Sequence, residues 1–301
     1  MNSADIKAYA LSIGLSACGI APVRYLFEEQ EHLDSWLENG YNADMTYMER
    51  NKDKRLDPSL MVEGVKSLIL VSLNYFPDKK FETAGRPIFA KYAYGEDYHK
   101  VLKDKLFLLL DFIRSKYENI NGRCFVDSAP VLEHSWAVEA GLGWIGKNSL
   151  LLSKKHGSFT FIGELMVDIE LEYDTPFSQS YCGTCTKCID ACPTSAIVEA
   201  KVIDARKCIS YNTIERRDDI PLEIKELMSD RIYGCDICQD VCPWNISLVS
   251  NNIPEFTPNE EILKMNYSDW ISLTDEKFKF ICKKSAINRV GLAKLNLNFT
   301  K

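Results

Sequence analysis

The stretch CGTCTKCIDACP, residues 182–193, is the most informative part of this chain. Its spacing, C-x2-C-x2-C-x3-C-P, is the one with which a polypeptide wraps a [4Fe–4S] cubane. Three closely spaced thiolates bind one cubane, and the fourth points towards a second cluster. The proline ends the turn and removes a backbone amide that would otherwise need a partner. This stretch therefore predicts an iron–sulfur fold with two clusters.

A second stretch, YGCDICQDVCP at residues 233–243, repeats the later part of that motif without its first cysteine, because position 232 is isoleucine. Two cubanes need about eight thiolates, and the two stretches supply seven. Cys208 lies between them and can supply the last one. The crossing rule assigns Cys182, Cys185, Cys188 and Cys242 to cluster one, and Cys192, Cys208, Cys235 and Cys238 to cluster two.

Zinc and disulfides are the competing explanations for the 11 cysteines. Zinc can bind four thiolates, but zinc sites do not require two such closely related stretches. Disulfides are typical of secreted chains, whereas the N-terminus resembles an amphipathic helix of the fold more than an export signal. The sequence therefore favours a cytoplasmic protein with metal-bound cysteines. Cys18, Cys124 and Cys282 lie outside both stretches and are expected to be buried structural cysteines.

The composition is ordinary for a folded protein, with 46% hydrophobic and 26% charged residues in a chain of 301. The longest apolar runs are far shorter than the ~18 residues that a membrane span needs. The net charge of −7 excludes a uniformly basic surface that coats nucleic acid, although it leaves room for a local basic patch.

Hydrophobic periodicity predicts alternating helices and strands up to about residue 170. The predicted helical segments are residues 1–65, which are expected to be mainly helical, 98–117 and 132–140. The predicted strands are residues 67–76, 87–94 and 123–126, and a hairpin formed by 149–153 and 159–169. Such an alternation favours an α+β or α/β domain built on one sheet.

The composition of the chain changes after residue 173, where short segments rich in Cys, Pro and Gly begin. We predict an α/β domain for the acceptor and substrate at 1–173, a two-cluster domain at 174–250 and a helical C-terminal segment at 251–301. The first part is too long for a plain electron carrier, so it must hold an acceptor or a substrate. Its glycine-rich residues 141–146 follow a predicted helix and not a strand, which disfavours a dinucleotide site.

Several segments together resemble the epoxyqueuosine reductases, which are cobalamin-dependent iron–sulfur enzymes that complete queuosine in tRNA. Besides the two cysteine stretches, the matching segments are KRLDP (54–58), YGEDYH (94–99), VDSAP (126–130), AGLGWIGKN (140–148) and CISY (208–211). They follow the family order over almost the whole chain. The related reductive dehalogenases share cobalamin and two clusters but lack this combination of segments.

The resemblance implies an α+β protein in which a nitroreductase-like α/β cobalamin-binding domain precedes a ferredoxin-like domain with two [4Fe–4S] clusters. It implies reduction of epoxyqueuosine to queuosine at the wobble position of tRNA anticodons, with the epoxide oxygen released as water. A low-potential flavodoxin or ferredoxin is the implied electron donor. The resemblance leaves open whether reduced cobalt acts on the epoxide carbon or on its oxygen. The chain is expected to be a short form without the helical-repeat domain that many members carry.

The resemblance also implies roles for individual residues. Asp127 matches the catalytic proton donor and a cobalamin contact, and enclosure by corrin and apolar walls is expected to raise its pKa. Arg55 matches a cobalamin-contacting arginine, whose guanidinium suits amide or phosphate oxygens. Arg217 matches a tRNA-contacting position. The other implied cobalamin contacts are Ala90, Leu151, Ile162, Ser210, Cys235 and Asp236.

Other conspicuous side chains have ordinary explanations. His99 and His134 are expected to be structural or supporting residues and not cobalt ligands. Trp136 and Trp144 are expected to pack in the core and not to stack on a base. The basic residues available for phosphate contacts are Arg216, Arg217, Arg231, Lys283, Lys284, Arg289 and Lys294, most of which are expected to lie on solvated faces.

Two rival functions remain compatible with the sequence. One is a cobalamin reductase that acts on a small organic halide, and tRNA dependence would distinguish it. The other is a non-catalytic electron-transfer protein, which would bind no corrinoid and would show only iron–sulfur absorption.

Overall fold

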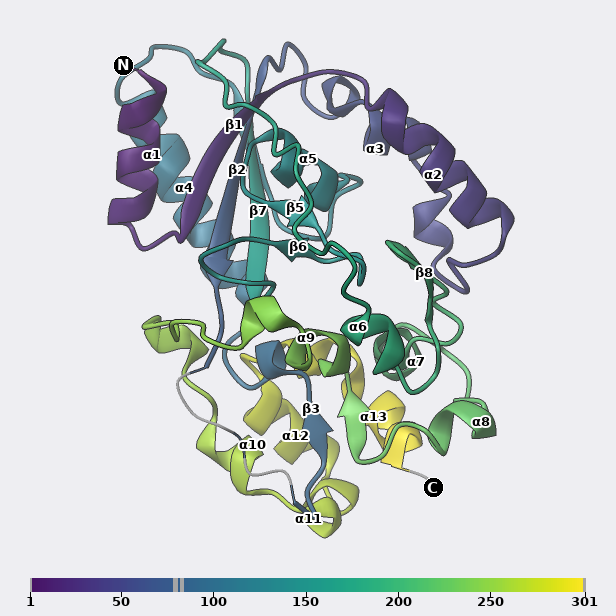
Figure 1. Ribbon diagram of the computed structural model, residues 1–301. Coiled ribbons are helices and arrows are strands. Elements are labelled where there is room, and N and C mark those ends of the chain that lie inside the picture. Colours follow the sequence, from purple (N-terminus) through teal and green to yellow (C-terminus); the bar gives the residue numbers. More distant parts are fainter. Residues whose placement is uncertain (1, 78–80, 82–83, 300–301) are drawn as a thin grey trace.

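A four-stranded antiparallel sheet forms the upper part of the molecule (Figure 1). The structure is a computed structural model that describes residues 2–77, 81 and 84–299. The sheet has the strand order β1-β2-β7-β4, and these strands span Ala17–Pro22, Ser67–Asn74, Thr160–Val167 and Gly122–Phe125. Every residue of β2 is buried, because this strand is central in the sheet and helices cover both of its faces.

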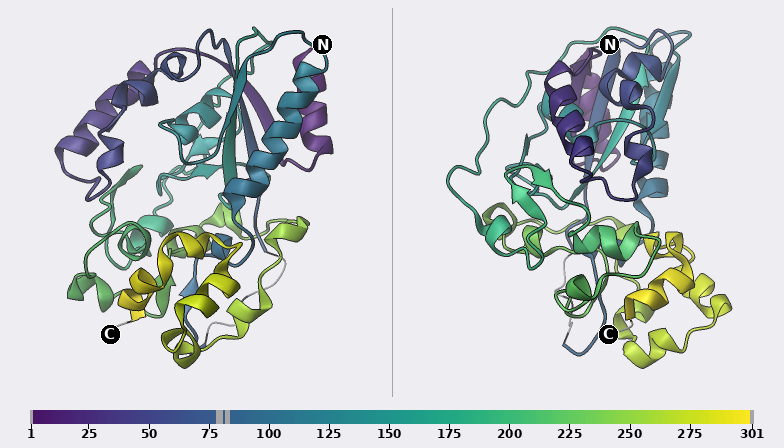
Figure 2. Two further views of the ribbon diagram at one scale, coloured as in Figure 1. Left: turned by 180° about the vertical axis from the view of Figure 1, so that it is seen from behind. Right: turned by 90° about the vertical axis from the view of Figure 1, so that its right-hand side faces the viewer.

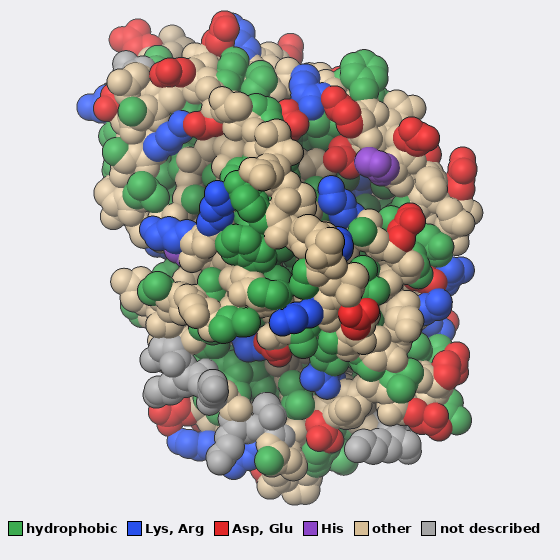
Figure 3. All heavy atoms as spheres, in the orientation of Figure 1, with side chains coloured by type: hydrophobic (Ala, Val, Ile, Leu, Met, Phe, Trp, Pro, Cys, Tyr) green, Lys and Arg blue, Asp and Glu red, His purple; other side chains and the backbone are tan. Residues whose placement is uncertain are grey.

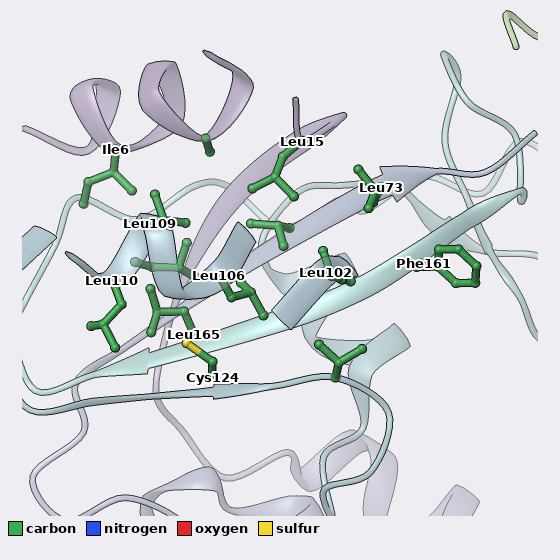
Figure 4. Packing of buried hydrophobic residues seen from close by; sticks show 14 of the residues in the cluster. Ile6, Leu15, Leu73, Leu102, Leu106, Leu109, Leu110, Cys124, Phe161 and Leu165 are labelled. Carbon is green, nitrogen blue, oxygen red and sulfur yellow. The ribbon is translucent and has the colours of Figure 1, made fainter. Parts of the chain in front are cut away.

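Helices α1 (Ser3–Ser12) and α4 (Tyr98–Arg114) cover one face of the sheet (Figure 4). α4 begins after its N-cap Asp97, whose carboxylate accepts the backbone N–H of His99. The apolar side chains of α4 recur at helical spacing and pack against β7 and β4; they are Leu102, Leu106, Leu109, Leu110 and Ile113. Burial of each contributes about 1.5–3 kcal/mol, so α4 is firmly held on the sheet.

Helix α5 (Glu133–Glu139) covers the opposite face, where Trp136 and Ala137 are fully buried. Its C-terminal end lies very close to β1, because a Cβ at Gly19 would lie 2.0 Å from the carbonyl oxygen of Ala140. A glycine at this position of β1 is therefore required by the packing of α5.

Helices α2 (Phe27–Glu38) and α3 (Lys52–Leu56) form an arm that reaches from the sheet to the lower part of the molecule (Figure 2). The indole N–H of Trp36 donates to the carbonyl oxygen of Ile203 at 2.7 Å. After α2, the hydroxyl of Tyr211 donates to the Asp44 carboxylate at 2.6 Å. These bonds connect the arm to the cysteine-rich part.

The chain crosses into the lower part between β2 and α4 and returns (Figure 1). In this crossing, β3 (Ile88–Phe89) pairs in parallel with β10 (Arg231–Tyr233), and a 3-10 helix follows β3. Phe89 packs there against Trp270 in a hydrophobic cluster with the C-terminal helices. These helices are α10 (Glu260–Lys264), α11 (Tyr267–Ile271), α12 (Asp275–Cys282) and α13 (Gly291–Phe299).

The cysteine-rich part consists of short elements. Two four-residue helices, α6 (Lys187–Asp190) and α9 (Ile237–Asp240), contact each other, and each begins within one of the two cysteine stretches. The other elements are β8 (Ile197–Glu199), β9 (Val202–Ile203), α7 (Ile209–Ile214) and α8 (Leu222–Lys225). The 3-10 helices in the described residues span Thr46–Met48, Pro58–Leu60, Lys91–Ala93, Pro243–Asn245, Pro254–Phe256 and Ala286–Arg289.

The expected α+β class is confirmed, and most predicted elements appear close to their predicted bounds. Strands β2 and β4 and helices α4 and α5 correspond to the segments predicted at 67–76, 123–126, 98–117 and 132–140. Helices α10 to α13 lie in the segment that was expected to be helical at 251–301. The ranges of the three predicted parts, and the likeness to nitroreductases, stay predictions.

Two predictions about strands are wrong, and one strand was missed. Residues 1–65, expected to be mainly helical, also contain strand β1, and the strand predicted at 87–94 is reduced to the two residues of β3. The predicted hairpin of 149–153 and 159–169 does not form, because its two halves pair elsewhere. Strand β6 (Leu151–Leu152) pairs with β5 (Trp144–Ile145), whereas β7 pairs with β2 and β4.

The surface carries charges of both signs. On the face shown in Figure 3, Lys and Arg side chains are interspersed with Asp and Glu, in agreement with the modest net charge of −7. Each helix in the described part of the chain is too short or too polar to cross a lipid bilayer.

Candidate functional site

Asp127 lies just beyond the end of β4, where the start of α4 meets it. Its backbone has φ = +56°, a left-handed conformation that is uncommon for a residue with a Cβ. The hydroxyl of Tyr98 donates to Oδ2 of Asp127 at 2.8 Å, and Nε2 of His99 lies 3.2 Å from the same oxygen. The Asp127 side chain is 49% exposed, so its carboxylate remains accessible from solvent.

His99 joins two carboxylates. Its Nδ1 lies 2.7 Å from Oδ1 of Asp97, while its Nε2 faces Asp127. Burial alone would lower the pKa of His99, but hydrogen bonds to Asp127 and Asp97 outweigh burial and raise this pKa to about 9. His99 therefore carries a proton at neutral pH.

Among the described side chains the pKa of Asp127 is lowered, whereas the rise expected from enclosure by corrin and apolar walls stays a prediction. The hydrogen bond from His99 lowers the pKa of Asp127, and although burial acts in the opposite direction, the bond from Tyr98 and the charges of His99 and Arg289 lower it further. At neutral pH the site thus contains an ionised Asp127 and a protonated His99. The pair keeps a proton on His99 at a pH where an aspartate alone would have lost its proton.

Two further carboxyl groups lie behind Asp127. Oε1 of Glu133 accepts the backbone N–H of Asp127 at 2.6 Å. Glu164, in the middle of β7, is fully buried. Burial and the charge of Asp127 raise the pKa of Glu133 to about 8, and burial and the charge of Glu133 raise the pKa of Glu164 well above its ordinary value.

Arg55, in α3, is buried, and one of its terminal nitrogens donates to the carbonyl oxygen of Tyr47 at 2.9 Å. Burial lowers the pKa of Arg55, while the charges of Tyr47 and Glu133 raise it. The predicted contact residue is therefore electrostatically coupled to the carboxyl group behind Asp127 and is not a solvated surface arginine.

Electrostatic interactions link cysteines within each of the two predicted sets, whereas the assignment of each cysteine to a cluster stays a prediction. Burial first, and then the charges of Cys182 and Cys185, raise the pKa of Cys242. The pKa of Cys188 is likewise raised by burial and by Cys242 and Cys182. These effects require the four thiols of the predicted first set to lie near one another.

The second set is coupled in the same way. Burial raises the pKa of Cys235 to about 11, and the charge of Cys208 adds to this rise. The charge of Cys192 contributes to the raised pKa of Cys208. The charges of Cys235 and Cys208 contribute to the raised pKa of Cys238. In the described ranges no three His, Cys, Asp or Glu side chains converge as the ligands of a single metal ion do. A cubane, by contrast, binds each thiolate at a different iron.

Three of the predicted cobalamin contacts share the wall of one cavity of about 450 Å³, namely Ala90, Cys235 and Asp236. The backbone N–H of Ala90 donates to the carbonyl oxygen of Tyr233 at 2.7 Å. Asp236 is buried and accepts the backbone N–H of Lys91 at 2.7 Å, which fixes the segment after Ala90 against the second cysteine stretch.

The remaining predicted residues lie in separate places. Leu151 and Ile162 are buried together in the hydrophobic cluster between α5 and the sheet. Ser210 is half-buried in α7, two residues after Cys208. Arg217 is exposed beyond the end of α7.

The ordinary explanations hold for several side chains. Trp136 and Trp144 are buried as expected. Cys124 and Cys282 are buried and Cys18 is half-buried, and burial raises the pKa of each of these thiols to about 12. His134, by contrast with His99, has a pKa that is lowered by burial.

Sequence reasoning missed Tyr98, Glu133 and Glu164, and it underrated His99. Glu164 had a detectable signal, because it is an acidic residue within the otherwise apolar run of β7. Tyr98 and His99 follow a capping aspartate, so their place at the exposed start of a helix was also readable.

The fold and the two sets of thiols define an iron–sulfur protein of the double-cluster class. Residues 181–245 match the family described as a 4Fe-4S double cluster binding domain. Residues 55–128 match the family described as "Epoxyqueuosine reductase QueG, DUF1730". The chain belongs to the epoxyqueuosine reductase family.

Individual relatives agree with this assignment. The chain is 49% identical over 298 residues to the epoxyqueuosine reductase of Cellulophaga algicola, covering 98% of this chain and 97% of that protein. It is 40% identical to the Escherichia coli enzyme, covering 95% of this chain and 76% of that one. A crystal structure of epoxyqueuosine reductase with a tRNA-Tyr epoxyqueuosine-modified stem loop superposes with a TM-score of 0.92 at 31% identity, covering 98% of this chain and 79% of that chain.

Proposed function

We propose that this chain reduces epoxyqueuosine to queuosine at the wobble position of tRNA anticodons. The observation that carries the proposal is the 49% identity to an epoxyqueuosine reductase over 98% of the chain. Agreement over the whole length constrains function more tightly than a shared fold does. The reaction adds two electrons and two protons to the epoxide, leaves an alkene and releases the oxygen as water.

The two cysteine sets are proposed to hold two [4Fe–4S] clusters, with the ligands assigned to clusters one and two as above. The match of residues 181–245 to a double-cluster domain supports this assignment, as does the electrostatic coupling within each set. Clusters of this kind accept and pass on single electrons. A flavodoxin or ferredoxin is the proposed donor to them.

Cobalamin is the proposed second cofactor, and two orphaned hydrogen-bonding groups support its fit. Nε of Arg55 and Oγ of Ser149 are buried, and neither has a hydrogen-bond partner among the described residues. Corrinoids carry amide oxygens and a phosphate that such donors can bind. When bound, cobalamin supplies a strongly nucleophilic and reducing cobalt centre. The proposed contacts besides Arg55 and Asp127 are Ala90, Leu151, Ile162, Ser210, Cys235 and Asp236.

Asp127 is proposed to face the epoxide oxygen, with His99 as the group that holds the proton. The proton on Nε2 of His99 passes to Oδ2 of Asp127, 3.2 Å away, and from there to the departing oxygen. Tyr98 keeps that carboxylate oriented through its 2.8 Å hydrogen bond. Because the pKa of His99 is about 9, the proton is available at neutral pH.

A tRNA carrying epoxyqueuosine is the proposed partner. The relative whose solved structure contains an epoxyqueuosine-modified stem loop supports this choice. Arg217 is proposed as a phosphate contact, because it is exposed and has no fixed place in the core. We further propose that cofactor and substrate lie in residues 1–173, the clusters in 174–250, and that the enzyme works in the cytoplasm.

The decisive experiment is nucleoside analysis of tRNA from cells that lack this protein. Epoxyqueuosine should accumulate and queuosine should disappear, and the wild-type chain should restore queuosine. Asp127→Asn should not restore it, although the variant should still bind iron and cobalamin. Normal queuosine in the deleted strain would refute the proposed function, and full complementation by Asp127→Asn would refute the proton-donor role.

A further inference from the structure

The backbone of Asp127 is held by a residue that has no assigned role. Asp127 adopts a left-handed conformation, φ = +56°, which is uncommon for a residue with a Cβ, although aspartate adopts it more often than most residues do. A 2.6 Å hydrogen bond from the Asp127 N–H to Oε1 of Glu133 holds the backbone in this conformation.

Glu133 belongs to a helix that is packed firmly against the sheet. It is the first residue of α5, the helix whose Trp136 and Ala137 are fully buried against the sheet. The Asp127 backbone is thus tied to a packed helix and not to another mobile loop. A displacement of the Glu133 carboxyl group would release the residue that presents the reacting carboxylate.

Glu164 explains how the Glu133 carboxyl group is kept in place. Glu164 is fully buried in β7, between Leu70 on β2 and Phe125 on β4, and neither of its oxygens has a conventional hydrogen-bond donor among the described residues. A buried carboxylate without a donor is very unfavourable. The side chains of Glu164 and Glu133 interact directly, and a protonated Glu164 can donate its hydrogen to the Glu133 carboxylate.

The charges around the pair agree with this protonation pattern. Asp127, Arg55, His99 and Tyr98 interact electrostatically with Glu133 from the neighbouring elements, as does Glu164. Burial and the mutual repulsion of the two carboxylates raise the pKa of both groups. At neutral pH the pair therefore retains a proton that can lie between its two members.

We propose that Glu133 and Glu164 form a proton-sharing carboxyl pair that fixes the backbone of Asp127 and so positions its carboxylate for epoxide reduction. This role rests on the function proposed above. Both glutamates are positioning residues, because the contact to the reacting groups is made by Asp127. A pair of buried acids is a poor choice for stability alone, since apolar side chains of the same size are often as stabilising.

The test compares three variants of the cofactor-loaded protein. Glu133→Ala removes the acceptor and should lower kcat about 100-fold, because a misplaced catalytic group commonly costs that much. KM for tRNA and the bound iron and cobalamin should stay within about 2-fold of wild type. Glu133→Gln keeps an amide oxygen at the same reach and should recover most of kcat. Glu139→Ala, on the same helix and paired with Arg24, is the matched control and should leave kcat unchanged.

A second readout does not depend on activity. Hydrogen exchange of residues 126–131 should speed up about 10-fold or more in Glu133→Ala, but not in Glu133→Gln or Glu139→Ala. If Glu133→Ala does not fold, Glu133→Asp replaces it, because the shorter side chain withdraws the acceptor. Unchanged exchange together with kcat within about 3-fold of wild type would overturn the positioning role. If the wild-type protein had no epoxyqueuosine reductase activity, that result would refute only the proposed function. The hydrogen-exchange measurement would still show whether Glu133 fixes the backbone of Asp127.

Discussion

Replacement of His99 by glutamine should change how stability depends on pH. In the folded chain His99 lies between the carboxylates of Asp97 and Asp127, and its pKa rises from an ordinary 6.5 to about 9. A raised pKa means that the folded state binds the proton more tightly than the unfolded state does. Glutamine can still donate one hydrogen bond here, but it carries no charge.

The size and the pH range of the effect follow from this shift. Each pKa unit corresponds to about 1.4 kcal/mol, so the upper limit for His99 is about 3.5 kcal/mol. The ring is 32% exposed, and solvent screening reduces the expected value to about 1–2 kcal/mol. The stabilisation is complete below pH 6.5, where both states are protonated, and disappears as the pH rises through 9. The lowered pKa of Asp127 reflects the same interaction and adds nothing further.

The assay is thermal unfolding of anaerobic, cofactor-loaded protein at pH 6 and pH 9.5. For a chain of this length 1 kcal/mol corresponds to about 2 °C. The difference in Tm between wild type and His99→Gln should therefore be about 2–4 °C larger at pH 6 than at pH 9.5. His32→Gln is the control, because the His32 side chain is 78% exposed, and it should show no such change. An equal Tm difference at both pH values would refute the charge state assigned to His99.

Three other changes separate packing, cluster ligation and tRNA contact. Gly157→Ala places a Cβ 1.9 Å from a side-chain oxygen at φ = +56°, and it should cost about 2 kcal/mol more in unfolding free energy than Gly291→Ala, which has φ = +73° and no described atom within 4 Å. Equal losses would contradict the packing. Cys208→Ala should lower the iron content from about eight towards about four per chain, while Cys18→Ala leaves it unchanged; a full iron content in Cys208→Ala would exclude Cys208 as a ligand. Arg217→Gln should reduce the slope of log affinity for tRNA against log salt by about 1. A wild-type slope would remove Arg217 from the phosphate contacts.

The fold could be predicted where local pattern and tertiary structure agree. α4 shows a clear stripe of leucines and β2 a continuous apolar run, and both appear where they are predicted. β1 has the sequence ACGIAP, which is poor in strand-forming residues, and it is a strand because it pairs along β2 under α5. Its glycine is explained only by the approach of Ala140, which no local pattern contains.

The predicted hairpin failed for a related reason. Segments that follow each other closely in sequence usually pair. Residues 151–153 do pair with neighbours in sequence, but mainly with β5 before them, and an isolated bridge joins Ser153 to Gly157 after them. β6 therefore pairs with β5, the strand that precedes it in the sequence. This pairing requires the two backbones to approach closely, because a Cβ at Gly143 would lie 2.0 Å from the carbonyl oxygen of Leu152. The absence of a side chain at Gly143 thus permits a strand pairing that the hydrophobic pattern alone cannot predict.

The candidate site was predictable in part. Spacing and counting were enough to propose the eight cluster thiols, including Cys208, and the electrostatic interactions among them agree with that proposal. The catalytic role of Asp127 was predicted from the resemblance, since its place after a strand alone indicates a strand-end or capping residue. Its charge state was not predicted, because that depends on His99 across a tertiary contact. The partners Glu133 and Glu164 come from two further elements, so no local pattern could join them to Asp127.

Three violations of ordinary local rules occur close together in this molecule, and their coincidence argues for the position of the reaction centre. Asp127 has a left-handed backbone without being glycine, Glu164 places a carboxyl group in the interior of a sheet, and Arg55 buries a nitrogen without a described partner. Glu133 interacts with all three, by a hydrogen bond to Asp127 and through its charge with the other two. Natural chains usually keep such unfavourable features only where function requires them. If Asp127, Glu164 and Arg55 served stability alone, replacing one should not change the effect of replacing another. A shared role in presenting the Asp127 carboxylate instead requires the effects of their substitutions on kcat to be non-additive.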